Sequence, residues 1–172
     1  MDATWMTLLL EERAAKFADL GGAVASLTVP VSERLINAVA ATRLPPSVRE
    51  LDIRAEAGNV LLVSVRLRSP AWLPRIKLKL GIERQPDLPR SPVLVVRLLS
   101  QGALAALAGP ATRFLDVLPP WIHMDGDLLS LDLARLLREY DAIDLLSYVQ
   151  RLDITTRKGS LVVAIDAHVP TV

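Results

Sequence analysis

Few residues of this chain have the types and spacing that could support chemistry. His123, Asp125 and Asp127 alternate around a predicted tight turn, and Asp166 and His168 alternate near the C-terminal end. Imidazole and carboxylate groups bind metal ions, but a stable transition-metal site needs three or four ligands held close together. No further ligand lies near either group in the sequence. We therefore interpret both groups as polar surface residues and predict no metal site.

The other usual signs of catalysis are missing from the sequence. The chain has two histidines and no cysteine, which excludes thiolate catalysis, disulfides and cysteine-based zinc sites. It also lacks the Gly-x-Ser-x-Gly motif, a glycine-rich phosphate loop and the Gly-x-Gly-x-x-Gly dinucleotide motif. We therefore predict no catalytic residues and no cofactor, and we expect that the protein is not an enzyme.

Basic residues form the second group that could act on a ligand. Residues 43–99 carry eleven Lys or Arg residues against five Asp or Glu, although the net charge of the chain is only +1. One interpretation is a solvated sheet face whose charges protect edge strands. The other is contact with a negatively charged lipid head group, for which the candidates are Arg66, Arg68, Lys77 and Lys79. Nucleic acid is disfavoured, because only 4% of the residues are aromatic and could stack on bases.

Strands must position these basic residues. Four predicted strands, 49–56, 60–68, 75–84 and 93–99, follow one another with short turns, and apolar residues recur at every second position in the first three. One face of this sheet is therefore apolar and the other charged. A helix predicted over 100–118 would lie on the apolar face. The candidate ligand-binding residues on this face and this helix are Leu61, Val63, Val65, Ile76, Leu78, Leu80, Val95, Leu104, Leu107, Phe114 and Leu115.

The flanking segments supply the remaining elements. Further helices are predicted over 3–20 and 33–42, with Ser32 expected to cap the second of them, and a helix or a helix pair is predicted over 132–146. A strand is predicted over 25–31, and hairpins are predicted over 121–131 and 148–169.

A short pattern occurs twice in the chain, 101 residues apart. Leu51-Asp52-Ile53 is repeated as Leu152-Asp153-Ile154, and Gly58 and Gly159 follow the two copies at the same distance. Sparse identity leaves chance similarity between strand sequences as an alternative explanation. If the repeat is real, we expect the two hairpins to be equivalent parts of one continuous sheet.

The order of these elements resembles that of the tubular lipid-binding (TULIP) superfamily and its small bacterial members. The resemblance covers roughly residues 25–169. It rests on the strand entering a helix at 29–37, the strands of 49–99, the helix ending at Leu118-Pro119-Pro120, and the last hairpin with Leu152-Asp153-Ile154. It implies a half-barrel, in which a long curved antiparallel sheet wraps around one or two helices, and a non-catalytic binder of acyl chains. Unlike the secreted members, this sequence shows no signal peptide and no lipidation cysteine.

Together these observations predict an N-terminal helix over 1–22 and a single α+β domain over 23–172. The expected function is binding of a lipid or other apolar small molecule in a groove between the curved sheet and the helix, with peripheral membrane contact as an option. The alternative is a structural or protein-protein interaction module whose aliphatic core is closed. No apolar run approaches the ~20 residues of a membrane-spanning helix, so we expect a cytoplasmic protein.

Overall fold

The computed structural model describes residues 17, 20–42, 44–68, 75–100 and 118–171. Residues 101–117 of the predicted helix over 100–118, and almost all of the predicted N-terminal helix, lie outside these residues. The described elements are, in chain order, β1 (Val24–Ser32), α2 (Glu33–Thr42), β2 (Val48–Glu56), β3 (Val60–Leu67), β4 (Ile76–Arg84), β5 (Val93–Leu98), β6 (Ile122–Asp125), β7 (Leu128–Asp132), α5 (Leu133–Glu139), the 3₁₀ helix η2 (Ile143–Ser147), β8 (Val149–Arg157) and β9 (Ser160–His168). The described chain is thus mostly antiparallel sheet with a few short helices, which confirms the α+β class.

The four consecutive predicted strands, of which the first three show apolar alternation, are present as β2 to β5. They form a six-stranded sheet in the order β2-β3-β4-β5-β7-β6. Its register brings like residues together: Ile53 lies opposite Val63, and Val63 lies opposite Leu78. One face of β2, β3 and β4 is therefore apolar, as the alternating residues predicted.

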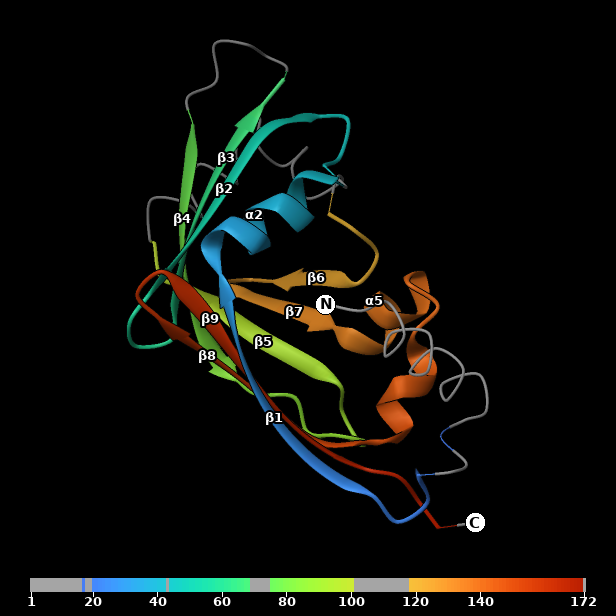
Figure 1. Ribbon diagram of the computed structural model, residues 1–172. Helices are drawn as coiled ribbons and strands as arrows, with labels where there is room; N and C mark the ends of the chain where they lie inside the picture. The colour runs from blue at the N-terminus through green and yellow to red at the C-terminus, as the bar shows by residue number, and fades with distance from the viewer. Residues whose placement is uncertain (1–16, 18–19, 43, 69–74, 101–117, 172) are drawn as a thin grey trace, which may run out of the picture.

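The remaining strands form a separate sheet, although one continuous sheet was expected. Strand β9 lies between β1 and β8, and both pairings are antiparallel. Figure 1 shows β1 running beside β9, although these strands stand at opposite ends of the chain. The described strands thus divide into a sheet of three and a sheet of six.

Side chains and turns, rather than a strand ladder, join the two sheets. The turn of the last hairpin meets β2, because Gly159 N donates a 2.9 Å hydrogen bond to Ala55 O. Thr156 is buried, with 6% of its surface exposed. Its hydroxyl donates to Glu56 O and accepts a 2.9 Å hydrogen bond from Val60 N. The Thr156 hydroxyl thus satisfies two backbone groups at the turn of the β2-β3 hairpin.

A glutamine side chain provides a second link between the sheets. Gln85 Nε2 donates to Ile154 O at 2.7 Å, and Ile154 N donates to Gln85 Oε1 at 2.9 Å. The amide thereby makes the two hydrogen bonds that a neighbouring strand would make with β8.

The two hairpins of the internal repeat occupy equivalent positions in the sequence. They do not lie in one common sheet, which the repeat predicts. Strands β2 and β8 begin and end 101 residues apart. The turns that follow them use Gly58 and Gly159 in the left-handed region, with φ of 81° and 83°, where glycine avoids the strain of a side chain. The two equivalent hairpins belong to different sheets.

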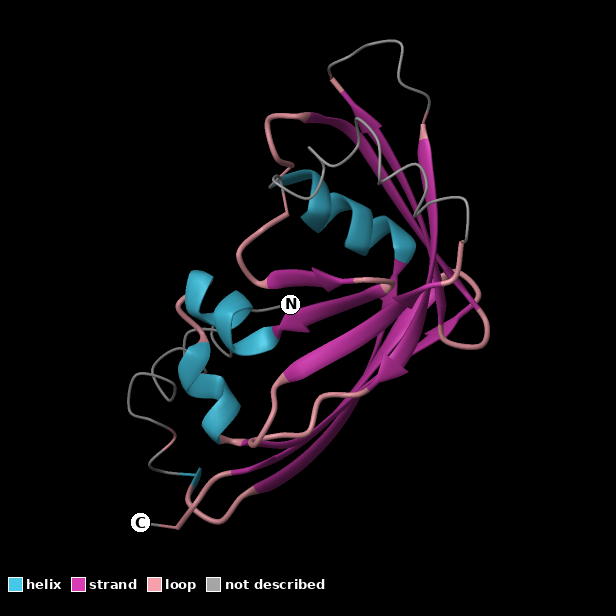
Figure 2. Ribbon diagram, turned by 180° about the vertical axis from the view of Figure 1, so that it is seen from behind, coloured by secondary structure: helices cyan, strands magenta, loops and turns pink. Residues whose placement is uncertain are grey.

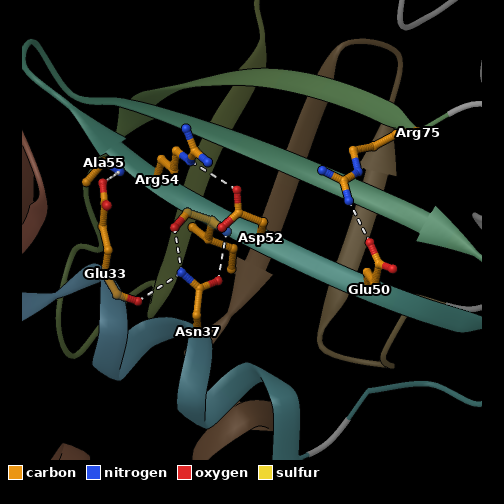
Figure 3. Close-up of polar contacts among 8 residues, drawn as sticks. Glu33, Asn37, Glu50, Asp52, Arg54, Ala55 and Arg75 are labelled. Atoms are coloured by element: carbon orange, nitrogen blue, oxygen red, sulfur yellow. Dashed lines mark hydrogen bonds and ion pairs between the residues drawn. The ribbon is translucent and has the colours of Figure 1, made fainter.

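Helix α2 starts at the predicted residue and covers the free edge of β2. Ser32 Oγ accepts a 3.3 Å hydrogen bond from Leu35 N, which confirms the predicted cap. Figure 3 shows two side chains of the helix reaching β2. Glu33 Oε1 accepts from Ala55 N at 2.7 Å. Asn37 Nδ2 donates to Ile53 O at 2.8 Å, and Asn37 Oδ1 accepts from Ile53 N at 2.8 Å.

The described core is small and lies on the six-stranded sheet. Its centre is formed by Ile76, Leu78 and Leu98, against which half-buried apolar residues of β3, β4, β6 and β7 pack. The described helices lie together on one side of the strands (Figure 2), but none of α2, α5 and η2 contains a buried residue. The core is therefore made mainly by strands.

Candidate functional site

The predicted ligand-binding residues separate into a buried group and a half-buried group. Val65, Ile76, Leu78 and Val95 are buried, with 2–8% of their surfaces exposed. Leu61, Val63 and Leu80 are half-buried. The buried group is part of the core, so it offers no surface to a ligand in this structure. The remaining candidates, Leu104, Leu107, Phe114 and Leu115, lie outside the described residues.

Val95 lies on the opposite sheet face from the predicted ligand-binding residues of β3 and β4. Leu98 is opposite Leu80 on the apolar face, whereas Val95 is opposite Ser130. Because side chains alternate between faces along a strand, Val95 and Leu98 point in opposite directions. Four apolar residues in a row, Val93 to Val96, hide this alternation in the sequence.

A different set of apolar residues is left open by the described chain. Leu27 and Val29 of β1 are 56% and 36% exposed, and Leu35 and Val39 of α2 are 53% and 54% exposed. We call these four residues the open apolar surface. The sequence carries a signal for it, since apolar residues recur every second position in β1, but it was not included in the predicted site.

The elements that carry the open apolar surface are firmly positioned. Leu27 lies opposite Ile165 of β9, and Ile165 lies opposite Leu152 of β8, so an apolar row crosses the three-stranded sheet. On α2, Leu35 and Val39 are one turn apart, and the bonds from Asn37 to Ile53 hold the other side of the helix against β2. These exposed side chains therefore belong to ordered secondary structure.

The predicted head-group residues Arg66, Lys77 and Lys79 lie on the face of the six-stranded sheet opposite its apolar core. Lys77 is opposite Ser64, and Lys79 is opposite Leu62. The lysines alternate with the buried Leu78, so a ligand on the apolar face does not reach them through the sheet. The charged face is hollowed into an open depression of about 470 Å³, lined by Asp52, Arg54, Leu62, Val63, Ser64, Arg75, Lys77, Leu78, Lys79 and Ser100.

The charges around this depression are unevenly paired. Glu50 forms ion pairs with Arg75 at 2.6 Å and with Arg66 at 3.7 Å, and the first of these is drawn in Figure 3. Within the described chain, neither Lys77 nor Lys79 has a carboxylate within 4.0 Å of its ammonium nitrogen. The two lysines thus leave net positive charge on this face.

The fourth predicted head-group residue, Arg68, follows β3 and is exposed. Its Nε donates a 3.2 Å hydrogen bond to Val48 O, so its guanidinium helps to hold the end of β2. Arg68 does not line the depression that Lys77 and Lys79 share.

Two of the five polar residues singled out from the sequence, Asp127 and Asp166, have structural partners. Asp127 Oδ2 lies 3.1 Å from Arg97 Nη1, and Glu83 Oε1 lies 3.0 Å from Arg97 Nη2. The hydrogen bond that Arg97 donates to Glu83, together with the charges of Glu83 and Asp127, raises the pKa of Arg97 above its usual value. Asp166 Oδ1 accepts a 2.6 Å hydrogen bond from Ser26 Oγ. Among the described residues, no group of three or more His, Asp or Glu side chains could hold a metal ion.

Comparison with known proteins adds no function to this geometry. No family model, curated protein or solved structure matches the chain. Within the described residues, no helix has the length and apolar character needed to cross a membrane.

Proposed function

We propose that this protein binds a lipid or other apolar ligand without catalysing a reaction, as the resemblance to the TULIP superfamily implies. One observation carries the proposal: the described helices lie on one side of the sheets but bury none of their residues, and the four side chains of the open apolar surface stay exposed in the described chain. A module with a closed core would be expected to bury these side chains.

Leu27 and Leu35 each leave more than half of their surface exposed to water. Burying a leucine fully is worth about 1.5–3 kcal/mol, and each methylene of a ligand that leaves water adds about 0.8 kcal/mol. An acyl chain over Leu27 and Leu35 would remove apolar area from water on both partners. We place the ligand on β1 and α2, because the residues first predicted to bind it on β3 and β4 are largely core.

The charged face of the six-stranded sheet and the open apolar surface have separate roles in this proposal. The apolar ligand contacts the open apolar surface, while Lys77 and Lys79 attract the protein to an anionic membrane from the other face of the six-stranded sheet. Such attraction is worth about 1 kcal/mol for each charge near an anionic lipid surface.

Native mass spectrometry of the purified protein, followed by organic extraction and lipid analysis, tests the ligand proposal. We expect a defined adduct, or a gain in mass after incubation with fatty acids and phospholipids. The double variant Leu35→Gln/Val39→Gln is expected to bind at least tenfold more weakly, because two half-exposed aliphatic groups of about 1 kcal/mol each are lost.

The matched control is Arg34→Gln/Ala38→Gln, which places the same amides on exposed positions of the same helix. It should keep the adduct of the wild-type protein. An apo mass that does not change with any of the added lipids would contradict the proposal and favour the alternative of an interaction module.

Vesicle flotation tests the role of the lysines. We expect Lys77→Gln/Lys79→Gln to reduce partitioning onto phosphatidylserine-containing vesicles roughly thirtyfold at low salt, since two charges of about 1 kcal/mol each are removed. The control Arg34→Gln/Lys158→Gln removes two exposed cations elsewhere. Equal losses in both variants would show that only net charge matters, and no binding by the wild type would exclude membrane contact.

A further inference from the structure

Strand β1 is the sheet edge that the described chain leaves without protection. The edge of β2 is covered by Glu33 and Asn37, and the edge of β8 receives the Gln85 side chain. The last edge, β6, is only four residues long and carries Asp125. In contrast, β1 has nine residues, none of them Asp, Glu, Lys or Arg, and all but one are exposed. Long uncharged edges are templates for pairing with another strand.

Hydrogen bonds at the two ends of β1 show which of its backbone groups are free. Val169 N donates to Ala23 O at 2.9 Å, and Glu33 N donates to Gly159 O at 3.2 Å. Between these points the odd-numbered residues face β9, because the bonds of an antiparallel pair alternate along a strand. The backbone groups of Val24, Ser26 and Thr28 therefore point to the open edge.

Pro30 occupies the next outward position, and it limits where a partner strand can pair. Proline has no N–H, so it is tolerated where that group would face solvent but removes a donor from the edge. A partner strand would therefore gain most hydrogen bonds along Val24 to Thr28.

We propose that β1 pairs with β1 of a second copy of this chain, antiparallel, with Ser26 opposite Ser26 and Val24 opposite Thr28. This register matches outward-facing residues with one another and leaves Pro30 outside the paired segment. It also brings Ala25 of one copy beside Leu27 of the other on the same face. Because β1 carries no charged residue, two copies meet without the like-charge repulsion that the other edges would impose.

The pairing joins two three-stranded sheets into one sheet of six strands across the twofold axis. The apolar rows that include Leu27 then become continuous between the copies. This assembly does not depend on lipid binding, and it can be tested on the protein without any ligand.

Size-exclusion chromatography with light scattering, over a micromolar to millimolar series, measures the assembly. We expect the wild type to form a discrete dimer, and Thr28→Lys to shift dimer formation at least tenfold to higher concentration. The control Thr155→Lys introduces the same charge at an exposed position on the other outer strand of the same sheet and should dimerise like the wild type. A wild type that is monomeric throughout, or equal effects of both lysines, would overturn the proposal.

Disulfide trapping tests the register, because the chain contains no cysteine. In the proposed dimer the two Ser26 Cα atoms are about 5.5 Å apart, within the range of about 4.4–6.8 Å for a disulfide. The two Val24 Cα atoms are about 14 Å apart, since four residues of strand separate them along the axis. Ser26→Cys should therefore cross-link under mild oxidation and Val24→Cys should not, although Val24 is 75% exposed. Equal cross-linking of the two variants, with circular dichroism like that of the wild type, would contradict this register.

Discussion

Replacing Leu78 with alanine is expected to lower the free energy of unfolding by about 2–5 kcal/mol, the usual cost of leaving a cavity in a core. Leu78 is 7% exposed and packs with Ile76 and Leu98 at the centre of the described core. The effect should be large because this core is small and the described helices bury nothing that could compensate. Urea denaturation followed by circular dichroism measures the change as a shift of the midpoint.

Leu35→Ala is the matched control for this substitution. It removes the same atoms from a side chain that is 53% exposed, so we expect a loss of less than about 1 kcal/mol, because less apolar area returns to water. If the two variants lost the same stability, Leu78 would not be a core residue, and a ligand-binding role for this strand would have to be considered again.

Replacing Asn37 with leucine is expected to destabilise the protein by about 1–3 kcal/mol for each backbone group that loses its partner. Asn37 bonds both the N–H and the C=O of Ile53 and also donates to Glu33 O at 2.9 Å. Leucine has a similar size, so it would keep water from the part-buried groups of Ile53 without bonding them. Urea denaturation again provides the measurement.

The control for Asn37→Leu is Arg34→Leu, which adds leucine at an exposed position of the same helix. We expect it to change stability by less than about 0.5 kcal/mol, as surface substitutions usually do. Asn37→Asp keeps the acceptor for Ile53 N but loses both donors, so its stability should lie between those of the wild type and Asn37→Leu. Equal stability of Asn37→Leu and Arg34→Leu would show that water replaces the lost bonds.

Local patterns in the sequence predicted most of the described elements. The helix after Ser32 was predicted over 33–42, and α2 spans Glu33–Thr42, because its start depends on a cap whose partners are three residues apart. The strands β2 to β4 were predicted because their apolar residues alternate. The face of Val95 was not, because consecutive apolar residues carry no alternation.

The division into two sheets could not be predicted in the same way. It depends on single polar side chains, such as Gln85 on Ile154 and Thr156 on Val60, whose partners are 69 and 96 residues away. Nothing in the local sequence distinguishes these residues from ordinary surface residues. The open apolar surface depends likewise on which helices approach which strands, and alternation within β1 does not determine that.

The pairing of β1 with β9 also constrains how the protein is made. Val24 lies opposite His168 and Val31 opposite Leu161, so nearly the whole chain must leave the ribosome before this sheet can form. At a synthesis rate of about 5–20 residues per second, β1 stays unpaired for on the order of ten seconds before β9 has been synthesised. During that time an uncharged apolar strand is exposed on the nascent chain, and it is a natural site for a holding chaperone.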